Sequence, residues 1–493
     1  MPSLLSWQRT VAGQRYEERQ DVRDVGPCPF GRAIFHGTNN ATTELPVEGQ
    51  AMLLRGATIL SMDDVSHDYL NGDILIEGSL ITAVAPTIER QDAFVIDCRG
   101  MVAIPGFQDT HRHSWEGQLR RIMPSGTMHD YFRTTHSVFA PYYSPHDMYV
   151  GNLLTAIHCI DAGITGLLDY SHNSQTLDHV DAALEALSDS GIRGVFAVGA
   201  PSAFNPSPGS CTWPDAVASV AERDVIRYNP LITLRMAGTP GSLDQRHFSL
   251  ADQLGIGVSV DAVAGPQSSE WIRLAEGAGW LGPNRTLIHC TALDDGAWEV
   301  IRRTETTVSL CPHADMHYMI HDGIPPLTQA LEAGVRPSIS IDDDAGLSSD
   351  MWTQMRLLLA SQRQAIAALR QTGATDKQPV TVFDMLEFAT LQGARANGLG
   401  STCGRLLPGL EADIVLLRAD DTLTMPLNNA YGSVVLGADT RSVDTVIIGG
   451  AIRKYRGSLI GIDVEALRDA VNSSRDRLLA ARQCVLDPLS RNA

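Results

Sequence analysis

Two histidines, His111 and His113, stand one residue apart in the stretch GFQDTHRHSWEG, at the end of the apolar run VAIPGF. Side chains two positions apart on an extended chain point the same way, so both imidazoles can meet one metal ion. His289 closes a second apolar run, LIHC, and Asp342 closes a third, SISID. Imidazole nitrogens and carboxylate oxygens are donors that zinc and related divalent ions accept. These four residues predict one metal site if the fold brings them together.

The elements that must position these residues are apolar runs that alternate with segments of helical periodicity between about residues 102 and 395. Strand and helix repeated eight times predict an α/β fold, a (β/α)8 TIM barrel, whose chemistry lies at the carboxyl ends of the strands. All four residues fall at such ends. The predicted strands are VAIPGF (102–107), ITGLLD (164–169), IRGVFAV (192–198), LITLRMA (231–237), IGVSVD (256–261), TLIHC (286–290), TVSL (307–310) and PSISID (337–342).

The chain on either side of the barrel has a different pattern. Residues 51–104 and 405–457 consist of short strands with glycine at the turns, and each is too small for a core of its own. We therefore expect one small β-sandwich domain formed from both chain ends, with residues 105–404 as the metal-dependent catalytic barrel. Residues 458–493 are expected to form a C-terminal helical segment. Residues 1–50 form a polar N-terminal arm that is either flexible or covers a neighbouring subunit.

Composition excludes several classes of partner. With 38 Lys and Arg against 57 Asp and Glu, the formal net charge of −19 argues against nucleic acid and anionic membranes. No apolar run approaches the about 20 residues of a membrane span, and the N-terminus lacks the pattern of a secretory signal. The eight cysteines include no CxxC pair, which is typical of reduced thiols. We expect a cytoplasmic protein that acts on a small molecule.

The text around the four residues resembles the amidohydrolase superfamily, in the branch that holds cytosine, guanine and S-adenosylhomocysteine deaminases and triazine chlorohydrolases. The resemblance extends from about Leu53 to Gly457. The chain is identified as a divergent member of this branch. The matching stretches are PGFQDTHRH, AGITGLLDYS, the IHC of the sixth strand, CPHADMHYMIHDGIPPL, SIDDDAGLSSDMWTQMR, ATLQGARANGLG and GRLLPGLEADIVLL.

The resemblance implies roles for individual residues. His111 and His113 match the metal ligands of the first strand, and Asp342 matches a metal ligand that is also a general base. His289 matches the sixth-strand histidine, which lies at the metal and contacts the attacking water or the substrate.

The resemblance also bears on the number of ions and on assembly. Other branches bridge two metals with a lysine carbamate on strand four, but neither Lys377 nor Lys454 falls on a barrel strand. We therefore expect one divalent ion per chain, zinc first, with iron or manganese as alternatives. A homo-oligomer, dimer or larger, is usual in the family.

The fifth strand departs from the family pattern. Asp261 stands where a metal-binding histidine is usual, and Ala264 stands where a catalytic glutamate is usual. Asp261 is either a carboxylate ligand or a hydrogen-bonded aspartate outside the metal shell. Alanine moves no proton, which disfavours the standard deaminase mechanism. The candidates for a replacement proton donor are His172, after strand two, and His321, after strand seven, in that order.

The leading hypothesis is a mononuclear metal-dependent hydrolase that acts on a C–N or similar bond of a small cyclic or heteroaromatic compound. Asp342 accepts the proton of a metal-activated water, and His289 hydrogen-bonds the developing oxyanion. Two alternatives stay open. One is a non-hydrolytic lyase, decarboxylase or cyclase on the same barrel, and the other is an inactive barrel that serves as a binding protein.

Overall fold

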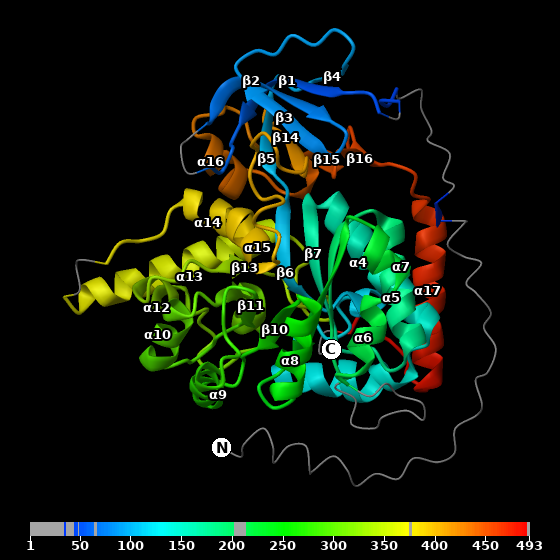
Figure 1. Ribbon diagram of the computed structural model, residues 1–493, viewed down its shortest axis with the longest axis vertical. Coiled ribbons are helices and arrows are strands. Elements are labelled where there is room, and N and C mark those ends of the chain that lie inside the picture. Colours follow the sequence, from blue (N-terminus) through cyan, green and yellow to red (C-terminus); the bar gives the residue numbers. More distant parts are fainter. Residues whose placement is uncertain are drawn as a thin grey trace.

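The computed structural model describes residues 34–35, 44–47, 49–63, 67–201, 213–373 and 377–490. They form a barrel of strands surrounded by helices, with a second sheet packed at one end of it (Figure 1). Most of the predicted N-terminal arm, residues 1–50, lies outside the described residues. Among the described helices, none is long and apolar enough to cross a membrane.

The barrel is an eight-stranded sheet in which the spatial order of the strands is their order along the chain. Every neighbouring pair is parallel, and a parallel bridge between Arg112 and Asp342 joins the first and last strands. The predicted TIM barrel is confirmed. Its strands are β6 (Phe107–Arg112), β7 (Ile164–Ser171), β8 (Arg193–Val198), β9 (Ile232–Gly238), β10 (Gly257–Asp261), β11 (Arg285–Ile288), β12 (Thr307–Leu310) and β13 (Ser338–Ile339).

The first barrel strand differs from its predicted position at residues 102–107. The structure divides that run: β5 (Met101–Pro105) pairs with strands of the second sheet, and β6 begins only at Phe107. Gly106 marks the division, because a Cβ there would lie 2.0 Å from the Thr165 hydroxyl oxygen. His111 therefore lies within the first strand, not after it.

Helices cover the outside of the barrel (Figure 1). Leu467 and Leu478 of the C-terminal helix α17 are buried, the former in a cluster with Leu153 and Ile157 of α4. The main helices are α4 (Pro145–Asp161), α5 (Leu177–Ser190), α6 (Ala216–Ala221), α7 (Asp224–Tyr228), α8 (Gln245–Leu254), α9 (Pro266–Gly277), α10 (Asp295–Arg303), α11 (Pro312–His317), α12 (Leu327–Glu332), α13 (Met351–Gln371), α14 (Val382–Ala389), α15 (Leu391–Ala396) and α17 (Val464–Ala481).

The second sheet combines both ends of the chain, as predicted. Its order is β17-β16-β15-β14-β5-β1-β2-β3, with β4 beside β1, and antiparallel pairing of β14 with β5 joins the two halves. The sheet curls, since the Ala412 amide, just before β14, donates to the Ser79 carbonyl, just before the edge strand β3. The exact domain boundaries stay a prediction. The strands not yet given are β1 (Met52–Ile59), β2 (Tyr69–Glu77), β3 (Leu80–Ala85), β4 (Phe94–Asp97), β14 (Ile414–Arg418), β15 (Val443–Ile448), β16 (Ala451–Tyr455) and β17 (Ser458–Leu459).

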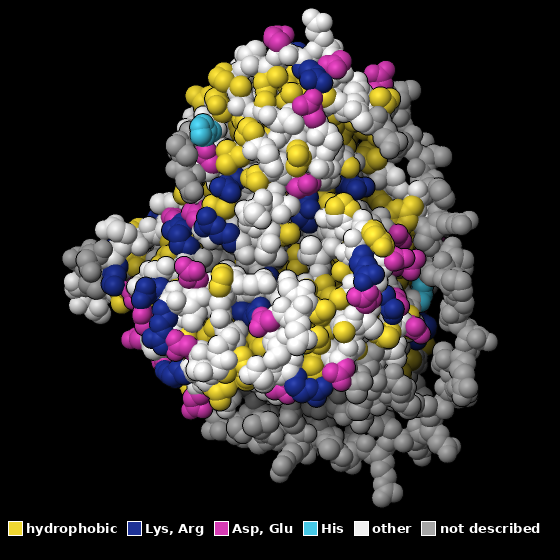
Figure 2. Space-filling view, in the orientation of Figure 1, with side chains coloured by type: hydrophobic (Ala, Val, Ile, Leu, Met, Phe, Trp, Pro, Cys, Tyr) yellow, Lys and Arg dark blue, Asp and Glu magenta, His cyan; other side chains and the backbone are white. Residues whose placement is uncertain are grey.

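The outer surface does not expose the predicted site. On the face shown in Figure 2, acidic and basic side chains are interspersed over the barrel helices. The predicted ligands His111, His113, His289 and Asp342 are all at most 5% exposed. The chemistry of the protein must therefore be sought inside the mouth of the barrel.

Candidate metal centre

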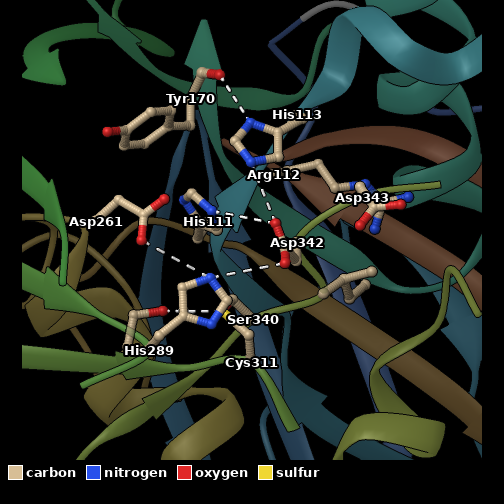
Figure 3. A network of polar contacts seen from close by, with 12 residues as sticks. His111, Arg112, His113, Tyr170, Asp261, His289, Cys311, Ser340, Asp342 and Asp343 are labelled. Carbon is tan, nitrogen blue, oxygen red and sulfur yellow. Dashed lines mark hydrogen bonds and ion pairs between the residues drawn. The ribbon is translucent and has the colours of Figure 1, made fainter. Parts of the chain in front are cut away.

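Asp342 is the meeting point of the predicted residues (Figure 3). Its Oδ1 lies 3.3 Å from Nε2 of His111 and 3.2 Å from Nε2 of His113. Its Oδ2 lies 3.7 Å from Nε2 of His289. Residues from β6, from the end of β11 and from the end of β13 thus converge on one carboxylate. We call these four residues the Asp342 centre.

The closure of the barrel fixes this carboxylate. The Asp342 amide donates to the His111 carbonyl at 3.0 Å, and the His113 amide donates to the Asp342 carbonyl at 2.7 Å. Asp342 has φ +81°, a left-handed conformation that costs a non-glycine residue energy. Backbone strain of this kind is typical of functional sites, because the surrounding structure must hold it in place.

The ring of His111 is poised as a neutral ligand. Burial lowers its pKa to about 4, so its nitrogens keep a free electron pair at neutral pH. Both ring nitrogens are buried without a hydrogen bond of normal geometry. Burial alone would raise the pKa of Asp342, but His111 and His113 lower it well below its usual value. A neutral imidazole beside an ionised carboxylate offers a nitrogen and an oxygen donor that a divalent cation fits.

A backbone carbonyl and a carboxylate orient the other two imidazoles. His113 Nδ1 lies 3.2 Å from the carbonyl oxygen of Tyr170, so that its Nε2 faces Asp342. His289 Nδ1 lies 2.8 Å from Oδ1 of Asp315. Outer partners of this kind are what fixes the tautomer of metal-binding histidines.

His289 differs from His111 in the direction of its pKa shift. Burial by itself lowers its pKa, but Cys311 and Asp315 raise it well above the usual value. With Nδ1 engaged by Asp315, the Nε2–H of His289 is held as a donor toward the interior of the centre. The sulfur of Cys311 belongs to the same cluster, because donor atoms of His111, His289, Cys311 and Asp342 all lie within 4.8 Å of one another.

Asp261 comes to the edge of the Asp342 centre. Its Oδ1 lies 4.0 Å from Nε2 of His289, and that oxygen is buried without a hydrogen-bond partner in the described structure. An unpartnered buried carboxylate oxygen is a group that a cation would satisfy. Ala264 lies three residues further on, and its amide donates to the Ser268 hydroxyl at 3.1 Å.

The structure separates the two predicted proton donors. His172 is buried, with its Nε2 2.9 Å from Nε2 of His136, and burial lowers its pKa well below the usual value. His321 is exposed, and its Nε2 lies 2.9 Å from the carbonyl of Val263. Neither side chain forms a hydrogen bond or ion pair with Asp342 in the described structure, so a proton-donor role stays a prediction for both.

Sequence reasoning missed several residues at the barrel mouth. Asp315 and Cys311 lie beside His289, although the stretch CPHADMH at the end of strand seven offered a signal for both. Glu116 and His136 are buried near His172. No sequence signal marks them, because they lie on irregular helical turns of the loop between β6 and α4.

Comparison with known proteins agrees with this geometry. The model of the amidohydrolase family matches residues 249–453. A 5-methylthioadenosine/S-adenosylhomocysteine deaminase of Pelotomaculum thermopropionicum is 26% identical over 442 residues, which cover 84% of this chain and 96% of that protein. A 5'-deoxyadenosine deaminase of Methanosarcina acetivorans is 23% identical over 87% of this chain and 98% of its own length.

Solved structures show the same fold. An adenosine deaminase from Xanthomonas campestris with bound zinc superimposes with a TM-score of 0.74 at 21% identity, over 88% of this chain and 100% of that chain. An atrazine chlorohydrolase from Arthrobacter aurescens TC1 in complex with zinc gives a TM-score of 0.72 at 19% identity, over 86% and 100% of the two chains. The predicted resemblance to the amidohydrolase superfamily is confirmed, and with it a metal-dependent hydrolase of the amidohydrolase type.

Proposed function

We propose that this hydrolase breaks a C–N or similar bond of a small cyclic or heteroaromatic compound with one divalent ion at the Asp342 centre. The observation that carries the proposal is the convergence of His111, His113 and His289 on one ionised, buried carboxylate. His111, His113 and Asp342 would hold the ion, with Asp261 as the further ligand and His289 beside it. Zinc fits this mixture of nitrogen and oxygen donors, and iron or manganese are the alternatives.

When bound, the ion supplies Lewis-acid polarisation of a water molecule and of the substrate. Asp342 accepts the proton of that water at a carboxylate oxygen. The barrel closure holds this oxygen in place, and its low pKa keeps it ionised until the reaction. His289 donates its Nε2–H to the oxyanion that develops on the substrate, an aimed donor worth about 2.7–4 kcal/mol in comparable sites.

The leaving group also needs a proton, which Ala264 cannot supply. Asp342 can return the proton that it has taken from the water, since its Oδ2 faces the interior beside His289. This assignment removes the need for a separate acid. His172 and His321 remain the two other candidates. The ring of His172 lies beside that of His113, and His321 lies at the surface.

The substrate class follows the relatives. Deaminases of adenosine-type compounds remove an amino group that is attached to a heteroaromatic ring. A compound with a ring of this kind is the substrate that we propose here. The loss of the glutamate at Ala264 favours a substrate whose leaving group needs little help from an acid. We further propose a cytoplasmic enzyme that assembles as a homo-oligomer.

The departures at Asp261 and Ala264 favour one second candidate. A centre without the usual histidine and glutamate of strand five could polarise a carbonyl for lyase, decarboxylase or cyclising chemistry instead of hydrolysis. Turnover of candidate heterocycles in ¹⁸O-labelled water separates the two. Hydrolysis places one labelled oxygen in the product, whereas an unlabelled product would remove the hydrolytic proposal.

A further inference from the structure

A second group of metal-type side chains lies next to the Asp342 centre. Glu116 lies on the 3-10 turn Ser114–Leu119, His136 lies on the π-helical turn Phe132–Phe139, and His172 follows β7. One donor atom from each lies within 4.8 Å of the other two, and all three residues are buried. We call these three residues the Glu116 cluster. The proposed hydrolysis uses neither Glu116 nor His136.

The two imidazoles of the cluster face each other through the same atom. His172 Nε2 and His136 Nε2 are 2.9 Å apart. Two nitrogens that each lie ~2.0–2.1 Å from one tetrahedral zinc ion are separated by ~3.3 Å, which is ~0.4 Å more than the separation observed here. The observed separation is therefore one that a shared cation accommodates with little movement.

A backbone carbonyl sets the ring of His172. Its Nδ1 lies 3.1 Å from the Tyr170 carbonyl oxygen, closer than the 3.4 Å to the indole nitrogen of Trp115. The same oxygen lies 3.2 Å from Nδ1 of His113. When a cation binds Nε2 of His172, the proton of the neutral ring lies on Nδ1 and is donated to this carbonyl, in place of the weaker contact in which the Trp115 indole N–H donates to Nδ1. One carbonyl thus orients an imidazole of each site, which is the usual outer partner of a metal-binding histidine.

Glu116 completes the cluster with a buried carboxyl group, one oxygen of which is unsatisfied. Its Oε1 accepts a hydrogen bond from the Tyr131 hydroxyl at 2.9 Å. Its Oε2 is buried and has no hydrogen-bond partner in the described part of the chain. A fully buried carboxylate oxygen without a partner is costly and calls for an ion or a donor that the protein itself does not supply.

We propose that Glu116, His136 and His172 bind a second divalent transition-metal ion of the zinc class. Two imidazoles and one carboxylate are a three-residue set that leaves a coordination position open for water or a substrate atom. The ring centroids of His113 and His172 are 4.1 Å apart, so the second ion adjoins the first. His172 then acts as a ligand, not as the proton donor that its sequence position indicated.

This inference goes beyond the proposed function and does not depend on it. The lysine carbamate of two-metal relatives plays no part in it, because neither Lys377 nor Lys454 lies on a barrel strand. The ion of the Asp342 centre and the ion of the Glu116 cluster share no ligand. Loss of either site should therefore leave the other able to bind metal.

The test is metal content after chelator treatment and reloading of the full chain with Zn²⁺ or Co²⁺, measured by elemental analysis. We expect two equivalents per chain in the natural protein, and one equivalent each in His136→Gln and in His111→Gln. The near-isosteric Glu116→Gln should also lose one equivalent and guards against misfolding of the histidine variant. Circular dichroism should match the natural protein in all three.

Cobalt spectra separate the possible failures. A second equivalent of Co²⁺ should add visible absorption that is lost in His136→Gln and kept in His111→Gln. If the natural protein binds only one equivalent, and this equivalent is lost in His111→Gln but kept in both cluster variants, the inference is overturned and the proposed function stays intact. If the natural protein binds one equivalent that only the cluster variants lose, the Glu116 site is supported and the proposed catalytic centre holds no metal.

Discussion

Two aspartates at the end of β13, Asp342 and Asp344, are two residues apart and have opposite surroundings. Asp344 is buried between guanidinium groups, with Arg112 Nη2 at 2.6 Å and Arg120 Nε at 2.8 Å. The Ser349 hydroxyl also donates to it. Burial raises its pKa, but the two arginines outweigh burial and lower it. Every charge in this network has a partner of opposite sign.

Asp342 faces three imidazoles and no arginine or lysine in the described structure, and several atoms around it lack a hydrogen bond. Nδ1 of His111 and Oδ1 of Asp261 are both buried without partners. The charge of Asp344 is balanced by two arginines of the protein itself, whereas no arginine or lysine pairs with Asp342 in the described structure, and a divalent cation would balance its charge. The comparison indicates that Asp344 serves structure and Asp342 serves chemistry.

The largest effect should come from Asp342→Asn. The amide keeps the shape of the side chain but cannot accept the proton of the water, so turnover should fall ~10²–10⁴-fold or more. The urea midpoint should stay near that of the natural protein. The measurement is kcat beside an equilibrium unfolding curve, and a normal rate would show that another group is the base.

The opposite result is expected for Asp344→Ala. Removing this carboxylate leaves the fully buried guanidinium of Arg112 without its main partner, which should cost about 3–5 kcal/mol of unfolding free energy. Chemical denaturation measures the loss. Asp342→Ala is the matched control, and equal destabilisation of both variants would end the distinction between the two aspartates.

Asp261 decides how far the Asp342 centre extends. If it is a ligand, Asp261→Ala should weaken metal affinity by at least the ~10–100-fold that loss of an outer partner causes, and Asp261→His should preserve or raise the affinity. Competition with a fluorescent chelator measures both. Unchanged affinity in the alanine variant would place Asp261 outside the metal shell.

The smallest expected effect is the change in unfolding free energy with pH that His158 causes. Burial and Arg120 lower the pKa of His158 to about 4, and its Nε2 donates to the carbonyl of Ser349. The unfolded chain binds this proton more readily, so the contribution is complete above pH ~6.5 and is lost as the pH falls toward 4. The slope for one proton is at most ~1.4 kcal/mol per pH unit.

His158→Gln removes this term. Its unfolding free energy should change less between pH 7 and pH 5 than that of the natural protein, as unfolding curves at the two values will show. An identical pH dependence in the two proteins would mean that His158 is not the group that titrates.

Much of the fold was predictable because each barrel strand is a short apolar run bounded by turns and helices. The exception is the first strand, where an unbroken apolar stretch serves two sheets and only Gly106 marks the crossing. The proximity of His289 and Asp342 was also predictable, because both residues follow barrel strands and a barrel brings the ends of its strands together. The hydrogen bonds of Asp315 and the positions of Glu116 and His136 depend on loop conformations that local sequence patterns do not determine.

The most direct test of the central claim is the anomalous diffraction of zinc in crystals of the reloaded protein. The account predicts an anomalous peak ~2.0–2.2 Å from Nε2 of His111, Nε2 of His113 and an oxygen of Asp342. A well-ordered barrel mouth with no peak among these three atoms, at full metal loading, would contradict it.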